Sequence, residues 1–171
     1  GVTNSRGRMP EQEAADTLDL AALNGIRGLD TAQAYGDSEE VLGRILPDKH
    51  EFRIVTKVAM FEAPDDLRRN FLQSLTRLRQ GSIYALLCHD AEQLLKPDGA
   101  AVWQAMKALQ SEGQVQKIGA SVYSQEQIAR LLAAFDIGII QLPFNLLDQR
   151  LLASEELRRL KGRGVEIHAR S

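Results

Sequence analysis

Short apolar, β-branched runs alternate with longer segments of helical spacing along almost the whole of this 171-residue chain. Such alternation predicts repeated strand–helix units whose strands form a parallel sheet. The predicted strands are residues 26–31, 52–58, 82–88, 116–122, 138–142 and 164–169. The predicted helices are residues 10–24, 38–46, 65–80, 99–112, 124–135 and 154–162. The chain therefore has to arrange six strands into one α/β fold.

Several predicted helices carry their own end signals. Gly25 and Gly113 directly follow helical segments, where a glycine commonly takes the left-handed conformation of a C-terminal cap. Ser124 and Gln127 match the Ser-x-x-Gln capping box at a helix start. These signals place helix boundaries independently of the hydrophobic pattern.

Six regular units fit either an open doubly wound sheet or part of an eight-stranded barrel. The glycine-rich phosphate fingerprint that opens a dinucleotide-binding doubly wound sheet is absent from the sequence. Polar residues instead follow successive predicted strands, as they do at the C-terminal face of a barrel. We therefore predict an α/β fold of the (β/α)8 TIM-barrel type, with six of the eight strand–helix units recognisable, in a single domain of residues 1–171.

The number of units predicts an incomplete barrel, because a complete one typically takes about 250 residues. The chain begins at Gly1 and not at Met, no strand precedes the predicted helix of residues 10–24, and the chain ends on a predicted strand. We therefore expect the natural N-terminus and the first and last barrel strands to be missing. An incomplete barrel exposes two sheet edges, which favours self-association. The 171 residues alone are not expected to form an active, closed, monomeric barrel.

The composition excludes several classes of partner. The 21 basic and 23 acidic residues are interspersed and give a net charge of −2, which leaves no electrostatic footprint for nucleic acid or an anionic membrane. A small-molecule partner is therefore expected. Cys88 is the only cysteine, which excludes an intrachain disulfide and fits the cytoplasm. The sequence contains no apolar run of the roughly 18 residues that span a membrane and no secretory signal at its start.

Four titratable side chains stand at or just past the ends of three consecutive predicted strands: Asp30, Tyr35, Lys57 and His89. Parallel strand ends meet at one face of a barrel, so these side chains could form a single proton-transfer site. Each has a plainer interpretation alone, since an Asp–Thr pair is commonly a turn or cap, a strand-end Lys is usually solvated, and Tyr35 and His89 could be structural. Lys57 could also be the Schiff-base nucleophile of a barrel lyase.

The sequence around these residues resembles the aldo-keto reductase family. Residues 29–43, LDTAQAYGDSEEVLG, are similar to the family signature in which Asp-Thr-Ala and Tyr-Gly precede Ser-Glu and Leu-Gly. The similarity continues in order and spacing through TK at 56–57, LLCH at 86–89, KIGASVY at 117–123, IIQLPFNLLDQR at 139–150 and VEIHARS at 165–171. It covers nearly the whole chain.

The resemblance implies an eight-stranded α/β barrel that transfers hydride between a nicotinamide cofactor, NADP(H) more than NAD(H), and an aldehyde, ketone or sugar-type alcohol. It assigns Tyr35 as the catalytic acid. A phenol, with a reference pKa of about 10, is a poorly matched proton donor near neutral pH, and an adjacent cation makes proton exchange easier. By resemblance Lys57 supplies that cation, Asp30 holds it in place, and His89 donates a hydrogen bond to the substrate oxygen.

The resemblance also implies cofactor contacts, with two departures. Ser121 and Gln141 match family positions that hold the nicotinamide carboxamide, but Val122 replaces the usual Asn, so one hydrogen bond is expected to be lost. Arg170 stands where the family often has a Tyr that stacks on nicotinamide. A guanidinium beside a positively charged oxidised nicotinamide is unfavourable unless displaced or paired, so we expect Arg170 to address a phosphate, a substrate anion or a structural carboxylate. The departures leave open a non-catalytic nicotinamide sensor or interaction module on the same scaffold.

No metal site is predicted. His50, His89 and His168 are scattered along the chain, and no Cys/His cluster has the spacing of a zinc site. Trp103 and Met106, three residues apart in a predicted helix, are expected to pack against a neighbouring element.

Overall fold

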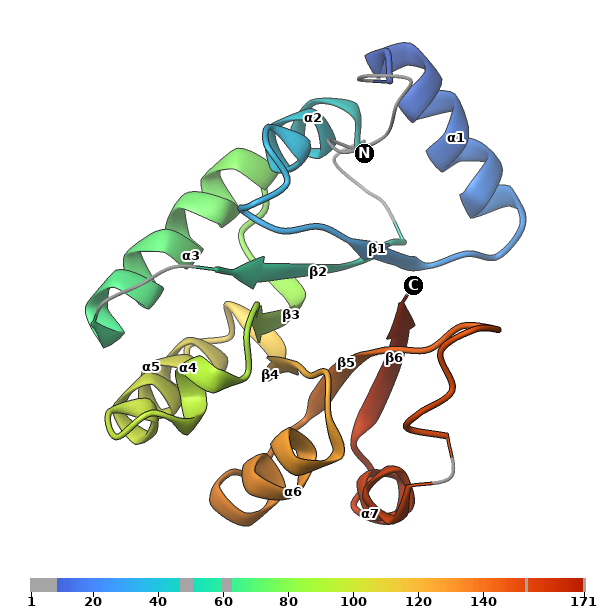
Figure 1. The fold of residues 1–171 in the computed structure, drawn as a ribbon. Coiled ribbons are helices and arrows are strands. Elements are labelled where there is room, and N and C mark those ends of the chain that lie inside the picture. Colours follow the sequence, from blue (N-terminus) through green and yellow to red (C-terminus); the bar gives the residue numbers. More distant parts are fainter. Residues whose placement is uncertain (1–8, 47–50, 60–62, 153, 171) are drawn as a thin grey trace.

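The computed structural model describes residues 9–46, 51–59, 63–152 and 154–170. Its six strands form a single parallel sheet in which they lie side by side in chain order, with β1 and β6 at the edges. The strands are β1 (Gly28–Asp30), β2 (Arg53–Val58), β3 (Ile83–Cys88), β4 (Val115–Ser121), β5 (Ile139–Pro143) and β6 (Glu166–Arg170). The sheet curls into part of a barrel (Figure 1).

Helices connect the strands on the outside of the curled sheet (Figure 1). They are α1 (Glu11–Leu23), α2 (Ser38–Ile45), α3 (Pro64–Leu78), α4 (Glu92–Leu95), α5 (Gly99–Ser111), α6 (Gln125–Ala134) and α7 (Glu155–Gly162). Every predicted strand and helix is present, with its ends shifted by at most two residues. The sequence pattern does not predict α4, because four residues are too few to show a helical period. The predicted barrel-type α/β fold is confirmed.

The end signals act as predicted at three helices. Gly25 and Gly113 have φ of 77° and 75°, the left-handed conformation that a residue with a Cβ adopts at a cost. The Ser124 side chain accepts a hydrogen bond from the backbone N–H of Gln127 at 3.2 Å. The Gln127 side chain accepts instead from the N–H of Tyr123, at 2.7 Å, so the capping interaction is shifted back by one residue.

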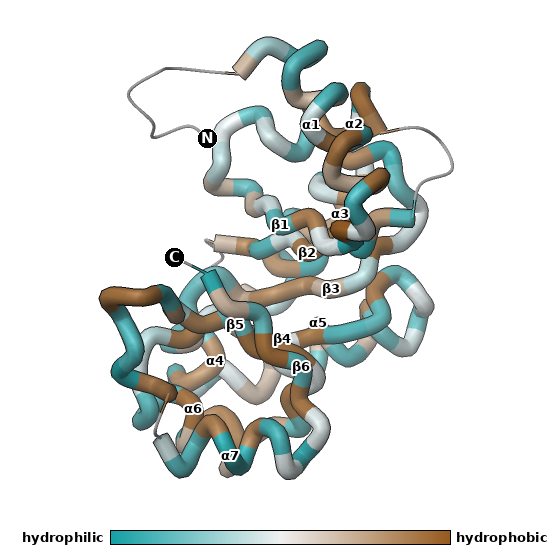
Figure 2. Tube along the Cα trace, turned by 90° about the vertical axis from the view of Figure 1, so that its right-hand side faces the viewer, coloured by the Kyte–Doolittle hydropathy of each residue, from teal (hydrophilic) through white to brown (hydrophobic). Residues whose placement is uncertain are grey.

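The main hydrophobic core lies between the sheet and the surrounding helices. α3 alone buries a stripe of four apolar side chains in it: Leu67, Phe71, Leu75 and Leu78. Trp103 and Met106 are buried as predicted, and the Trp103 ring packs on Phe135 with 5.2 Å between centroids. Figure 2 shows hydrophobic residues concentrated along the central strands. At about 1.5–3 kcal/mol for each large side chain, this burial is what holds the helices on the sheet.

A smaller cluster fills the concave side of the sheet. It consists of buried Val55, Ala85, Leu87 and Ile139, with Tyr84 packed against it. β4 and β5 approach each other closely here. A Cβ on Gly119 would lie only 1.7 Å from the carbonyl oxygen of Ile139. Only glycine fits at this point of β4.

Candidate active site

Three successive strands deliver the four predicted side chains to the same end of the sheet. Asp30 is the last residue of β1, Lys57 is next to last in β2, and His89 directly follows β3. Tyr35 lies in the loop between β1 and α2, where Gly36 takes a φ of 61° and turns the chain back. The structure therefore brings together side chains that are up to 59 positions apart, 30 to 89 in the chain.

Lys57 is the centre of this group. Its side chain is 1% exposed, and its Nζ donates to Asp30 Oδ2 at 2.7 Å, to the carbonyl oxygen of Thr31 at 3.0 Å and to Tyr35 Oη at 3.4 Å. A buried ammonium is costly unless it is paired and hydrogen-bonded. The three acceptors use all three donors of the ammonium group, so Lys57 holds Asp30 and Tyr35 at fixed positions on either side of itself.

Asp30 also ties the first strand to the fifth. Its Oδ1 accepts a hydrogen bond from Gln141 Nε2 at 2.8 Å, across the concave side of the sheet. Because Gln141 is 2% exposed, this bond fixes the amide orientation and leaves its Oε1 without a partner among the described residues. Asp30 therefore orients both Lys57 and a predicted cofactor residue.

His89 lies against the ring of Tyr35. The two rings meet edge to face, with 5.8 Å between centroids and an interplanar angle of 86°. Burial, followed by the positive charges of Lys57 and Arg170, lowers the pKa of His89 below its ordinary value of 6.5. At neutral pH the imidazole is therefore mainly uncharged, with one ring nitrogen as a hydrogen-bond donor.

Further polar contacts hold α2 against the strand ends, and the sequence reasoning missed them. Buried Thr56 donates to Glu39 at 2.6 Å, and Arg77 reaches the other oxygen of Glu39 at 3.4 Å. Thr31 donates to the Ser38 hydroxyl at 3.0 Å. The available signal was Thr56, a second polar residue beside Lys57 within the buried part of β2. These bonds fix both ends of the loop that carries Tyr35.

Two buried groups next to the four-residue site have unused hydrogen-bonding atoms. Ser121 ends β4 and is 1% exposed, and its Oγ has no partner among the described residues. Together with Gln141 Oε1 it offers one donor and one acceptor, which is the complement of a primary amide such as the nicotinamide carboxamide. The residues present therefore fit that group. Val122 is buried in the main hydrophobic core, and its backbone N–H donates to the carbonyl oxygen of Gln141 at 2.8 Å.

Arg170, the last residue of β6, lies over the ring of Tyr123 with 4.8 Å from its guanidinium carbon to the ring centroid. Its own carbonyl oxygen accepts from the N–H of Phe144 at 2.8 Å. No carboxylate among the described residues pairs with its guanidinium. The structural carboxylate allowed by the sequence is thus absent from the described part of the chain.

Two cavities adjoin the site. One of about 370 Å³ lies between β1 and β6, and a second of about 510 Å³ lies beside His89. The first is lined by Gly28, Leu29, Asp30, Val55, Gln141, Ile167, His168, Ala169 and Arg170. The second is lined by Ala34, Ala59, His89, Asp90, Glu92, Tyr123 and Gln127. Asp30 lines one cavity and His89 the other, so each cavity reaches one member of the four-residue site.

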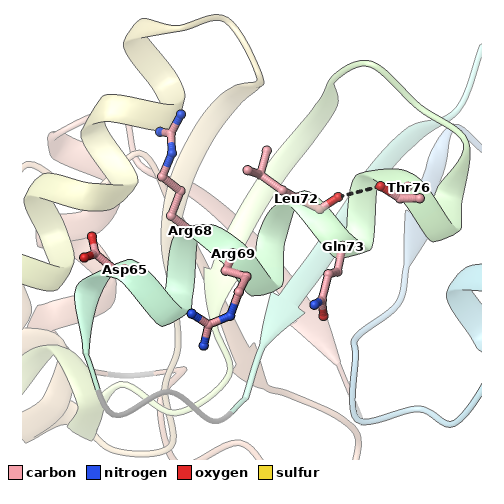
Figure 3. Close-up of a pocket in the computed structure, with 6 residues that line it drawn as sticks. All are labelled: Asp65, Arg68, Arg69, Leu72, Gln73 and Thr76. Carbon is pink, nitrogen blue, oxygen red and sulfur yellow. Dashed lines mark hydrogen bonds between the residues drawn. The ribbon is translucent and has the colours of Figure 1, made fainter.

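A hollow of about 420 Å³ on α3 has no comparable chemistry. Figure 3 shows its lining side chains, which project from a single helix: Asp65, Arg68, Arg69, Leu72, Gln73 and Thr76. Arg68 is paired with Glu112, and Thr76 donates back to the carbonyl oxygen of Leu72. None of the predicted site residues lines this hollow.

A second polar network lies deeper on the concave side, and the sequence reasoning missed it. Glu166 accepts hydrogen bonds from Tyr84, from Lys117 at 2.5 Å and from His168 at 2.6 Å. Burial alone would raise the pKa of Glu166, but the bonds from Lys117, Tyr84 and His168 outweigh it and lower the pKa to about 2. Arg53 lies over the Tyr84 ring at 5.2 Å. The network therefore joins β3, β4 and β6 beneath the site.

Neither a membrane span nor a metal cluster is found in the described parts of the chain. None of the helices there is long and apolar enough to cross a bilayer. No three His, Cys, Asp or Glu side chains in those ranges gather in a way that could hold a metal ion, and His50 lies outside them.

Comparison with known proteins finds one matching protein family and several similar proteins and solved structures. The model of the Aldo/keto reductase family matches residues 1–171. Aldo-keto reductase YhdN of Bacillus subtilis is 28% identical over 159 residues, covering 85% of this chain and 47% of that protein. The NADH-specific methylglyoxal reductase of Escherichia coli is 25% identical over 190 residues, covering 96% of this chain and 58% of that protein. A solved Pseudomonas aeruginosa structure described as an aldo-keto reductase superposes with a TM-score of 0.84 at 28% identity, covering 98% of this chain and 66% of that one. The chain thus spans about half the length of these curated relatives.

Proposed function

Because the family match spans all 171 residues, this chain belongs to the aldo/keto reductase family, and from that premise we propose that it carries the catalytic site of a nicotinamide-dependent oxidoreductase. The proposed reaction interconverts a carbonyl compound and its alcohol. The observation that carries the proposal is the buried Lys57 ammonium, which contacts both Asp30 and Tyr35. A bound nicotinamide would supply or accept the hydride.

Tyr35 is proposed as the general acid of carbonyl reduction. Its hydroxyl gives a proton to the substrate oxygen as that oxygen gains negative charge. The Lys57 ammonium, 3.4 Å away, stabilises the negative charge left on the phenol oxygen. Asp30 keeps the ammonium in place and neutralises its charge when Tyr35 is protonated. In alcohol oxidation the proton transfer is reversed, and Tyr35 acts as the base that accepts the proton of the alcohol.

His89 is proposed to orient the carbonyl. Its ring contacts the Tyr35 ring edge to face, and His89 itself lines the cavity of about 510 Å³. With its pKa lowered by burial and by two nearby cations, the neutral imidazole can donate a hydrogen bond to a carbonyl oxygen without adding a further positive charge. Two donors, Tyr35 and His89, would then converge on one substrate oxygen.

Ser121 and Gln141 are proposed to hold the nicotinamide carboxamide. Their unused Oγ and Oε1 atoms supply the donor and acceptor that an amide needs, and Asp30 fixes the Gln141 amide. The Val122 side chain, buried in the main hydrophobic core, adds no hydrogen bond to the carboxamide. We propose NADP(H) over NAD(H) as the cofactor, because NADPH is the usual cofactor of the family. The Escherichia coli relative, in contrast, is described as NADH-specific.

The proposed substrates are small aldehydes, ketones or sugar-type alcohols. The cavity of about 510 Å³ beside His89 suits molecules of this size. The Escherichia coli relative is described as a methylglyoxal reductase, which supports a small carbonyl substrate. A cytoplasmic location accompanies the proposal, since the single thiol of Cys88 is buried and unpaired.

The proposal is tested by nicotinamide absorbance at 340 nm with the full gene product that carries this sequence. A panel of aldehydes and ketones is reduced with NADPH and with NADH, and sugar alcohols are oxidised with the corresponding oxidised cofactors. We expect turnover of several small carbonyls. No turnover on any substrate with either cofactor, by a folded protein, would overturn it.

A second candidate function is a nicotinamide sensor without catalysis. It is favoured by Val122 and Arg170, which stand where the family has a carboxamide ligand and a stacking ring. Cofactor binding in a fluorescence titration, without turnover across the whole panel, would support it. A Schiff-base lyase is disfavoured because the Nζ of buried Lys57 is engaged by Asp30, Thr31 and Tyr35. Borohydride trapping of a carbonyl compound on Lys57 would reverse that judgement.

A further inference from the structure

Arg170 presents a half-buried guanidinium whose hydrogen-bond donors have no acceptor among the described residues. Most arginines in those ranges are paired, as Arg68 is with Glu112 at 2.7 Å and Arg77 with Glu39 at 3.4 Å. The guanidinium carbon of Arg170 lies over the Tyr123 ring, 4.8 Å from its centroid. A cation–π contact takes up no N–H donor, so the planar fork of the guanidinium stays available to an acceptor.

The position of Arg170 joins it to the proposed site of reaction. Arg170 lines the cavity between β1 and β6 together with Asp30 and Gln141, and its stacking partner Tyr123 lines the cavity beside His89. The positive charge of Arg170 also contributes to lowering the pKa of His89. Arg170 therefore lines one cavity and contacts Tyr123 of the other, so a ligand that extends from His89 toward β6 would approach its guanidinium.

Among the described residues, no acidic side chain around the site forms an ion pair with Arg170. Asp30 is held by Lys57 and Gln141. Asp90 accepts from the backbone N–H of Glu92 at 2.9 Å.

Glu92 in turn accepts from Gln127 at 2.9 Å and lies 3.6 Å from Arg130. Arg170 is thus a cation at the site without a carboxylate partner among the described residues. A single positive charge with acidic neighbours suits a monoanion better than a phosphate, which carries about −1.5 to −2 charges near neutral pH.

We propose that Arg170 binds the carboxylate of the substrate, so that the protein acts on aldehydes or ketones that carry a carboxylate in preference to their neutral analogues. This inference rests on the proposed function, because it names the substrate class of that same site. Arg170 is a specificity-determining residue in this proposal. Its planar fork would take the two carboxylate oxygens in a bidentate pair while the Tyr123 ring contacts the guanidinium.

The test compares matched charged and neutral substrates in the full gene product at saturating cofactor. Succinic semialdehyde carries a carboxylate, and its methyl ester has the same aldehyde without the negative charge. A second pair, glyceraldehyde 3-phosphate and glyceraldehyde, tests in the same way whether the site prefers a phosphate. We expect kcat/KM to be at least about tenfold higher for the acid than for the ester. Arg170→Met should bring this ratio close to one, and Arg170→Lys should give an intermediate ratio.

Arg158 provides the matched control, since it is an exposed arginine of α7 away from both cavities. Arg158→Met removes the same net charge and should keep the wild-type ratio. Equal kcat/KM for acid and ester in the wild type, or a clear preference for the phosphorylated aldehyde, would overturn the inference while leaving the proposed function intact. An Arg170→Met variant with weaker cofactor binding and an unchanged ratio would also overturn it, assigning Arg170 to the cofactor. Absence of turnover on every carbonyl would instead remove the proposed function itself.

Discussion

Glu166→Gln should destabilise the folded protein, because Glu166 is the shared acceptor of the network beneath the site. Its carboxylate accepts from Tyr84, Lys117 and His168, which belong to three different strands. Glutamine keeps the size of the side chain and one acceptor oxygen but removes the negative charge that compensates Lys117. The change therefore isolates the charge of Glu166 from its packing.

The magnitude follows from the pKa of Glu166, which falls from an ordinary 4.5 to about 2 in the folded protein. At about 1.36 kcal/mol for each pKa unit, this corresponds to about 3 kcal/mol at neutral pH, an upper value because the side chain is 26% exposed. A depressed carboxyl pKa stabilises the folded state above the unfolded pKa. This stabilisation is fully present above about pH 4.5 and is lost as the pH falls through about 2.

The assay is urea unfolding of the full gene product and its variants at several pH values between 7 and 2.5. We expect Glu166→Gln to lower the free energy of unfolding by about 1–3 kcal/mol at pH 7, and the difference from wild type to shrink progressively below pH 4.5. Glu112→Gln is the control, since its pair with Arg68 is solvent-exposed and should change stability little. A Glu166→Gln variant as stable as wild type at pH 7, or a difference that does not change with pH, would refute this reasoning.

Three further predictions concern the sheet and the site. Gly119→Ala should reduce stability severely, since its Cβ would lie 1.7 Å from the carbonyl oxygen of Ile139; thermal unfolding monitored by circular dichroism measures this. Lys57→Met should lower kcat about 100-fold or more, because Tyr35 loses its cationic neighbour; steady-state rates at saturating cofactor check it. Ser121→Ala should weaken cofactor binding about five- to tenfold, because one carboxamide bond is lost; a fluorescence titration checks that, and unchanged affinity would remove Ser121 from the cofactor site.

The order of strands and helices could be predicted from the sequence because each element carries its own local signal. Hydrophobic spacing predicts α3, and glycines mark the ends of α1 and α5. The grouping of Asp30, Tyr35, Lys57 and His89 followed from a general property of parallel sheets, whose strand ends meet at one face. The curl of the sheet, confirmed by the structure, then placed them in contact.

The network around Glu166 could not be predicted, because it depends on strand register and on curvature between residues 82 positions apart. Tyr84 and Glu166 meet only because β3 and β6 face each other across the concave side. A signal was nevertheless present, since Glu166, His168 and Arg170 alternate with apolar residues in β6 and so share one face. The pattern predicts a polar inner face but not which partners from other strands occupy it.

The most direct measurement for the proposed site is single-turnover nicotinamide oxidation by Tyr35→Phe, with cofactor binding measured in parallel. Phenylalanine keeps the ring that packs against His89 and removes only the hydroxyl near Lys57. We predict that the rate of nicotinamide oxidation with a small aldehyde falls at least about 100-fold while cofactor affinity stays within about twofold of wild type. A rate within about threefold of wild type would contradict the assignment of Tyr35 as the proton donor.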